Sequence, residues 1–393
     1  MNATELPLSP VRSSRRRTPL AWRNLVHHKP TMLISSAAVA FAVVIMFMEL
    51  GFLNGLYDSQ TGLLRALDTD LVMVSPGLHK LNTHETFPRS RLVQAAGIDG
   101  VASVWPLYLE DRLAELRNPA NGAVHGIRVI GFEAEAHPFE GRKIARLCER
   151  LRLPMTVLFD WRSRSFLGPL EAEMQTELAD RRITVADTFD LGPDYYYDGN
   201  VLAGLDTFFT LFPNNSRDQV SIGLIRLRPH ASERAVLRDI REAIGPEAEV
   251  MRKAEITARE MASWRRGTPA GYVFTMGVVV GFVIGVFICY QILYIEITDH
   301  LPQLATLRAM GYQDAALVRL VLTQSALLGL FGFVPAIGAA FGLYSVLTAL
   351  TGIVTKLTLA RVALVAVLTL GMCLVSGVLA LRKALEADPA ELF

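Results

Sequence analysis

Four long apolar blocks dominate the hydrophobic pattern of this chain, at residues 32–53, 272–295, 315–354 and 362–381. A bilayer core takes about 20 apolar residues per helix, so each block is long enough to cross it. The third block is too long for one straight span, and Pro335 predicts a kink within it. The pattern therefore predicts a polytopic α-helical membrane protein with four transmembrane helices.

The first block has a second interpretation, that of a cleaved signal peptide. It follows a polar segment that occupies residues 1–30, and it continues well past the small residues Ala37 to Ala40. A signal peptide has a shorter apolar core that ends at its small residues. An uncleaved anchor helix is the interpretation that the pattern favours.

Between the first two blocks, residues 58–268 contain no candidate span. Short β-rich runs occur at 70–75, 124–132 and 221–228, and helical spacing of apolar residues occurs at 231–244. We therefore expect a mixed α/β extracytoplasmic domain inserted between transmembrane helices 1 and 2.

The charges that flank the blocks set the orientation. Six basic residues precede the first block, and no acid lies between Glu5 and Glu49, so the N-terminus is expected in the cytoplasm. Arg382 and Lys383 follow the last block and predict a cytoplasmic C-terminus. The predicted segments are a cytoplasmic N-terminus (1–30), helix 1 (31–57), a periplasmic α/β domain (58–268), helix 2 (269–296), a cytoplasmic coupling helix (297–314), helix 3 (315–350), a periplasmic loop (351–361), helix 4 (362–382) and a cytoplasmic C-terminus (383–393).

The N-terminal segment has an amphipathic pattern just before the first span. Trp22 and Leu25 share one face of a possible helix, whereas Arg23 lies on the other. This pattern predicts a short helix in the cytoplasmic membrane interface. The alternative is a basic flank that only enforces the topology.

Composition and motifs narrow the function. The chain is 51% hydrophobic but 20% charged, and its net charge is +1, which does not favour a nucleic-acid partner. It contains no Gly-Lys-Ser/Thr sequence for a phosphate-binding loop, and no GxSxG or HExxH motif. His79, His84 and Glu85 are better explained as loop side chains than as a metal site. We therefore expect no enzyme, no metal and no directly bound cofactor.

The connection between the second and third spans is helical in pattern. Leu301, Leu304, Leu307 and Met310 repeat every three residues, and Gly311 permits the left-handed residue that ends a helix. The pattern indicates a short cytoplasmic helix that is tied to two spans and can be pushed by a partner. An ordinary tight connection remains the alternative.

Small residues recur every four positions in the second block, at Gly277, Gly281 and Gly285, and in the third block at Gly338 and Gly342. Such faces allow helices to approach closely. They fit either a dimer seam or packing within one subunit.

The segment His300–Tyr312 resembles the coupling-helix motif of MacB/FtsX-like (type VII) exporter permeases, and more closely that of DevC-type subunits. The similarity covers nearly the whole chain in ordered blocks, at Pro19–Trp22, Met46–Phe52, Phe87–Leu92, Leu153–Asp160, Ile222–Leu227, Tyr290–Tyr294 and Ala387–Phe393. One position departs from the family, which usually carries Glu where this chain has Gln303.

This resemblance implies a permease subunit of a tripartite ABC exporter in the inner membrane, acting as a homodimer. ATP and Mg²⁺ are then bound by a separate ATPase, whose motion reaches the periplasmic domain and pushes cargo through a periplasmic adaptor and an outer-membrane channel. The cargo that the resemblance implies is a lipid or glycolipid. The residues expected to contact the ATPase are Leu301, Pro302, Gln303, Leu304, Thr306, Leu307, Arg308, Gly311 and Tyr312.

Two other functions remain open at this point. One is an FtsX-like signalling subunit that keeps the ATPase but activates a periplasmic hydrolase. The other is a membrane scaffold without an ATPase.

Overall fold

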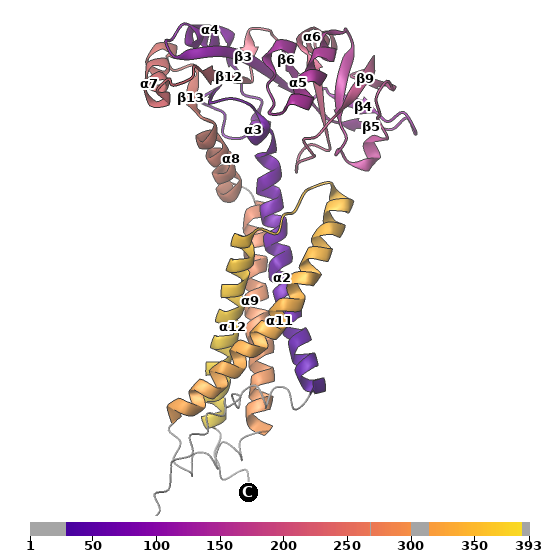
Figure 1. Cartoon of the computed structure of the whole chain (residues 1–393). Helices are drawn as coiled ribbons and strands as arrows, with labels where there is room; N and C mark the ends of the chain where they lie inside the picture. The colour runs from indigo at the N-terminus through magenta and orange to yellow at the C-terminus, as the bar shows by residue number, and fades with distance from the viewer. Residues whose placement is uncertain (1–28, 268, 300–313, 387–393) are drawn as a thin grey trace, which may run out of the picture. The chain divides into compact units, whose positions relative to one another are not determined.

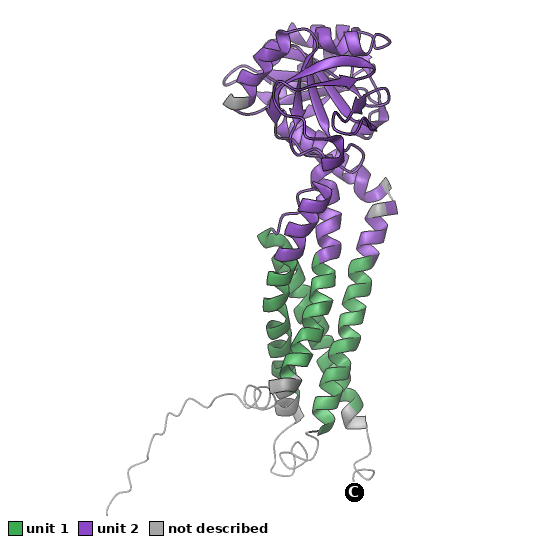
Figure 2. Ribbon diagram, turned by 90° about the vertical axis from the view of Figure 1, so that its right-hand side faces the viewer, with its two compact units in different colours: residues 1–47, 277–340, 358–393 green, residues 48–276, 341–357 purple. Residues whose placement is uncertain are grey.

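The computed structural model describes residues 29–267, 269–299 and 314–386 of the chain. It divides into two compact units (Figure 2). The first contains 1–47, 277–340 and 358–393, and the second contains 48–276 and 341–357. The two units are described separately below.

Four helices are long and apolar enough to cross a membrane (Figure 1). They are α2 (Lys29–Gln60), α9 (Pro269–Asp299), α11 (Asp314–Thr351) and α12 (Leu359–Glu386), and α11 continues through Pro335. The prediction of four such helices, with an α/β domain after the first, is confirmed within the described residues.

In the first unit, the helices approach closely at glycines. A Cβ at Gly332 would lie 2.5 Å from Cγ1 of Val39, and a Cβ at Gly329 would lie 3.0 Å from Sγ of Cys373. These positions bring α11 against α2 and against α12 at distances that a larger side chain would not allow. The first unit is therefore a helix bundle in which neighbouring helices approach each other closely at glycines.

The second unit is built on one 11-stranded sheet, in the order β13-β1-β12-β3-β6-β10-β7-β9-β8-β4-β5. Neighbouring strands are antiparallel except for the parallel pairs β10–β6 and β7–β9. The strands are β1 (Leu71–Val74), β3 (Val101–Glu110), β4 (Glu115–Arg117), β5 (Val124–Gly126), β6 (Arg128–Phe132), β7 (Thr156–Asp160), β8 (Gln175–Leu178), β9 (Arg181–Phe189), β10 (Asn200–Gly204), β12 (Ile222–Leu227) and β13 (Glu249–Arg252). A separate two-stranded sheet pairs β2 (Phe87–Pro88) with β11 (Gln219–Val220).

Both faces of the large sheet are buried. In β1, Leu71 and Met73 belong to one hydrophobic cluster, and Val72 and Val74 belong to another, because successive side chains of a strand point to opposite faces. The first face is covered by α4 (Arg89–Ala96), α6 (Leu205–Leu211) and α7 (Glu233–Ile244). The second is covered by α3 (Gly62–Ala66), α5 (Arg142–Cys148) and α8 (Lys253–Gly267), with the 3-10 turns η1 (Leu81–Thr83) and η3 (Glu149–Arg152). The domain is therefore a sheet between two layers of helices (Figure 1).

Candidate functional site

A small hydrophobic cluster lies where helix ends meet the α/β domain of the second unit. Leu56 and Tyr57 from α2 pack with Trp264 from α8, and Phe274 at the start of α9 packs against them. Trp264 is only 1% exposed and is among the largest fully buried side chains. We call Leu56, Tyr57 and Trp264 the junction cluster.

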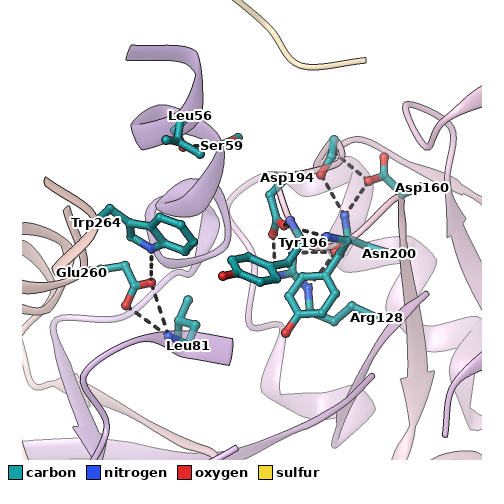
Figure 3. A network of polar contacts seen from close by, with 12 residues as sticks. Leu56, Ser59, Leu81, Arg128, Asp160, Asp194, Tyr196, Asn200, Glu260 and Trp264 are labelled. Atoms are coloured by element: carbon teal, nitrogen blue, oxygen red, sulfur yellow. Dashed lines mark hydrogen bonds and ion pairs between the residues drawn. The ribbon is translucent and has the colours of Figure 1, made fainter. Parts of the chain in front are cut away.

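A buried carboxylate ties this cluster to the domain. Oε1 of Glu260 accepts a hydrogen bond from Nε1 of Trp264 at 2.9 Å, and Oε2 accepts one from the backbone N–H of Leu81 at 3.1 Å (Figure 3). Nζ of Lys80 lies 4.9 Å from the Trp264 ring centroid. Helix α8 is therefore held to η1 by polar contacts as well as by apolar packing.

Burial raises the pKa of Glu260 above its ordinary value of 4.5, although the hydrogen bonds from Trp264 and Leu81 and the charge of Lys80 act against the rise. The folded chain thus holds this proton more tightly than the unfolded chain does. The free energy of unfolding should therefore fall as the pH rises from 4.5 through the folded-state pKa.

We expect Glu260→Gln to flatten this dependence, because glutamine does not titrate and keeps one acceptor oxygen. Thermal midpoints of the full chain in detergent, measured from pH 4 to 8 for both proteins, test the expectation. Equal slopes in the two proteins would show that Glu260 does not titrate as its surroundings indicate.

Two tyrosines of the loop between β9 and β10 pack on the same tryptophan. The ring centroids of Tyr195 and Tyr196 lie 6.4 Å and 5.3 Å from that of Trp264. Aromatic pairs at these separations add attraction beyond their buried area. The loop at 190–198 therefore contacts α8 through its aromatic side chains.

Asp194 fixes the conformation of this loop. Its Oδ1 accepts hydrogen bonds from the backbone N–H groups of Tyr196 and Tyr197, at 2.8 Å and 2.9 Å. Its Oδ2 accepts one from Nη1 of Arg128 at 2.9 Å, and both side chains are at most 5% exposed. The backbone that carries the two tyrosines is thus anchored to strand β6.

Asp160, at the end of β7, anchors the start of the same loop. It accepts hydrogen bonds from the backbone N–H of Gly192 at 2.7 Å and from Nδ2 of Asn200 at 2.8 Å. Asn200 in turn accepts two hydrogen bonds from Arg128, at 2.8 Å and 2.6 Å. Burial raises the pKa of Asp160, which these hydrogen bonds partly offset. Arg128, Asp160, Asp194 and Asn200 form one connected set, the buried polar network (Figure 3).

The end of α11 and the residues after it also reach this region. A Cβ at Gly51 of α2 would lie 2.5 Å from the ring of Tyr344, and one at Gly55 would lie 3.0 Å from Cγ2 of Thr355. Gly352 has a φ of +71°, and a Cβ there would lie 2.8 Å from Cγ of Pro193. Loop 190–198 therefore contacts both α8 and the residues that follow α11.

The junction cluster and the buried polar network are both tightly packed within the second unit. Buried side chains that are packed and hydrogen-bonded move together, because cores are close-packed and deform little.

Within the described residues no group of three or more His, Cys, Asp and Glu side chains is placed to hold a metal ion. His84 contacts Asp111 at the surface of the domain.

Some of the residues singled out from the sequence lie outside the described residues, and others lie within them. The expected coupling helix (Leu301, Pro302, Gln303, Leu304, Thr306, Leu307, Arg308, Gly311 and Tyr312) and the expected interfacial helix (Trp22, Arg23 and Leu25) lie outside the described residues. In α9, a Cβ at Gly281 would lie 3.2 Å from Ile45, and one at Gly285 would lie 2.5 Å from Met372. These two glycines therefore face helices of the same chain, while no heavy atom lies within 4 Å of a Cβ at Gly338 or Gly342.

The junction cluster and the buried polar network did not emerge from the sequence. One signal was present, since Glu260 and Trp264 are four residues apart and so share a face of a helix. The partners of this pair lie far away in the chain. Leu81 is 179 residues from Glu260, and Arg128 is 66 residues from Asp194.

One family model matches part of the chain. Residues 275–389 match the family model "FtsX-like permease C-terminal". This part of the chain is therefore similar to the C-terminal region of FtsX-like permeases. No curated protein sequence gives a match.

Solved structures resemble the α/β domain. The periplasmic region of MacB from Actinobacillus actinomycetemcomitans is 8% identical, with a TM-score of 0.35, over 49% of this chain and 92% of that one. The extracellular domain of the noncanonic ABC-type transporter YknZ from Gram-positive bacteria is 12% identical, with a TM-score of 0.33, over 47% and 100%. A domain of a putative permease protein from Porphyromonas gingivalis is 19% identical, with a TM-score of 0.29, over 46% and 87%.

Proposed function

We propose that this chain is the permease subunit of a tripartite ABC exporter and that it transmits the motion of a separate ATPase to its α/β domain. In this proposal ATP and Mg²⁺ are bound by the ATPase, and the chain works as a homodimer with both termini in the cytoplasm. The α/β domain lies in the periplasm and drives a lipid or glycolipid cargo into an adaptor and an outer-membrane channel.

The observation that carries the proposal is the junction cluster with its polar anchors. Helix α2 enters the domain through Leu56 and Tyr57, and α9 leaves it beside Trp264, so two helices of spanning length end in one packed cluster. Glu260 and loop 190–198 join this cluster to the sheet. A displacement of either helix would thus be passed to the domain rather than absorbed by a flexible linker.

Purification of the tagged full chain from its own membranes tests the proposal. An ATPase together with an adaptor and an outer-membrane channel is the expected set of partners. An ATPase with a cell-wall hydrolase would instead support the signalling function, which the FtsX-like permease domain keeps open. The absence of any ATPase would contradict both and favour a scaffold.

The segment expected to receive the ATPase can be tested separately. We expect Arg308→Glu to reduce recovery of the ATPase at least several-fold, because Arg308 is the one charged residue between His300 and Asp314. Gln303→Glu is the control, since it restores the residue usual in the family and should leave recovery unchanged. Wild-type recovery with Arg308→Glu would show that this segment is only a connector.

A further inference from the structure

In the second unit, a cavity lies beside the junction cluster. It encloses about 420 Å³, which is within the usual range for small-ligand sites. One wall is apolar and is formed by Phe52 of α2, Phe274 of α9, and Leu347 and Leu350 of α11. The opposite wall comes from the α/β domain.

The apolar wall is made by the ends of three helices of spanning length. Phe52 lies near the end of the apolar stretch 32–60, Phe274 near the start of 271–299, and Leu347 near the end of 321–351. The cavity therefore lies where the apolar helices give way to the polar domain. Leu350 is 79% exposed, so a large apolar side chain stands open beside it.

On the side of the α/β domain, the cavity is lined by Arg164, Ser165, Phe166 and Tyr195. Among the described residues that line the cavity, Arg164 is the charged one. Besides Ser165 and Tyr195, hydroxyl groups are supplied by Thr351, the last residue of α11, and by Thr355 after it. Nη1 of Arg164 pairs with Oδ1 of Asp198 at 2.8 Å, but its Nε has no acceptor within the described part of the chain. Since a guanidinium has five N–H donors, Arg164 retains donors for an anionic ligand.

We propose that this cavity binds one anionic phospholipid of the surrounding bilayer, with an acyl chain against Phe52, Phe274 and Leu347 and its phosphate at Arg164. An acyl chain suits an apolar wall that is continuous with spanning helices, and a phosphate suits a guanidinium at the polar boundary. A soluble anion would leave the apolar wall unfilled, and an uncharged lipid would leave Arg164 without a ligand.

The bound lipid would also contact the machinery of the junction. Leu56 and Tyr195 line the cavity, and the same two residues belong to the contacts around Trp264. The lipid would then fill the space between α2, α11 and loop 190–198, and its loss would loosen the junction. The inference stands apart from the proposed function, because a chain that recruits no ATPase can still bind the lipid.

The test is native mass spectrometry of the full chain in detergent, titrated with phosphatidylglycerol or phosphatidylcholine. We expect one phosphatidylglycerol per chain to be retained at least about tenfold more tightly than phosphatidylcholine. Arg164→Gln should remove this preference. Arg217→Gln is its matched control, because Arg217 pairs with Asp206 at 3.0 Å outside the cavity.

The apolar wall is tested by filling it. Leu347→Trp should abolish the single tight site, whereas Val346→Trp, on the neighbouring exposed position of α11, should leave it intact. If Leu347→Trp does not fold, Leu350→Trp provides the same test at a side chain that is already exposed. Equal binding of the two lipids by the wild type would overturn the proposal, as would tight binding that survives in a folded Trp variant.

Discussion

Replacing Trp264 with alanine is expected to lower the free energy of unfolding of the α/β domain by about 3–5 kcal/mol. The side chain is 1% exposed and packs on Leu56, Tyr57 and Tyr196, so its removal leaves a cavity lined by three helices and a loop. Its indole N–H also donates a hydrogen bond to the buried carboxylate of Glu260. The measurement is denaturant unfolding of the full chain in detergent, followed by the tyrosine and remaining tryptophan signals.

Two controls separate the causes of this loss. Trp161→Ala makes the same chemical change at a side chain that is 62% exposed, and its effect should stay within about 0.5 kcal/mol. Trp264→Phe keeps most of the apolar volume but removes the N–H that Glu260 accepts, so an intermediate loss of about 1–3 kcal/mol is expected. If Trp264→Ala is no more harmful than Trp161→Ala, the junction cluster does not hold the helices to the domain.

The second large effect is expected at Asp194. Changing Asp194 to alanine should cost about 3–5 kcal/mol, because it leaves the guanidinium of Arg128 buried without its ionic partner. It also frees the backbone N–H groups of Tyr196 and Tyr197. Hydrogen exchange of these two amides should therefore speed up together with the loss of stability, which unfolding of the same sample measures.

The matched control for Asp194 is Asp206. It pairs with Arg217 at 3.0 Å, as Asp194 pairs with Arg128, but its side chain is 91% exposed. Asp206→Ala should therefore change stability by no more than about 0.5 kcal/mol. Equal effects of the two substitutions would mean that the buried polar network does not stabilise loop 190–198.

The long helices and much of the sheet domain could be predicted from the sequence, because both depend on local patterns of apolar residues. Each long helix is an apolar run in the sequence. In α7, Val236, Ile240 and Ile244 recur at helical spacing and form its buried face. The predicted strands at 124–132 and 221–228 fall on β5, β6 and β12. Helix α2 continues to Gln60, beyond the predicted transmembrane segment 31–57, through the polar residues Asp58 to Gln60.

The site could not be predicted in the same way, because it joins distant parts of the chain. Glu260 alone in a sequence is an ordinary acidic residue of an amphipathic helix. It becomes an anchor only when the backbone of Leu81 lies 3.1 Å from its carboxylate. Similarly, nothing local distinguishes Asp194 from the half-buried Asp198, whereas the structure buries the first fully against Arg128. The order of strands decides such contacts, and hydrophobic spacing does not reveal that order.

The central claim is that ATPase motion reaches the α/β domain through the junction cluster. It is tested most directly by the distance between two spin labels on the domains of a homodimer purified with its ATPase. Glu242→Cys supplies an exposed attachment point on α7, since Cys148, Cys289 and Cys373 are buried. This distance is expected to change when ATP is bound, and Trp264→Ala is expected to abolish the change while ATP is still hydrolysed. The same ATP-dependent change in wild type and in Trp264→Ala would contradict it.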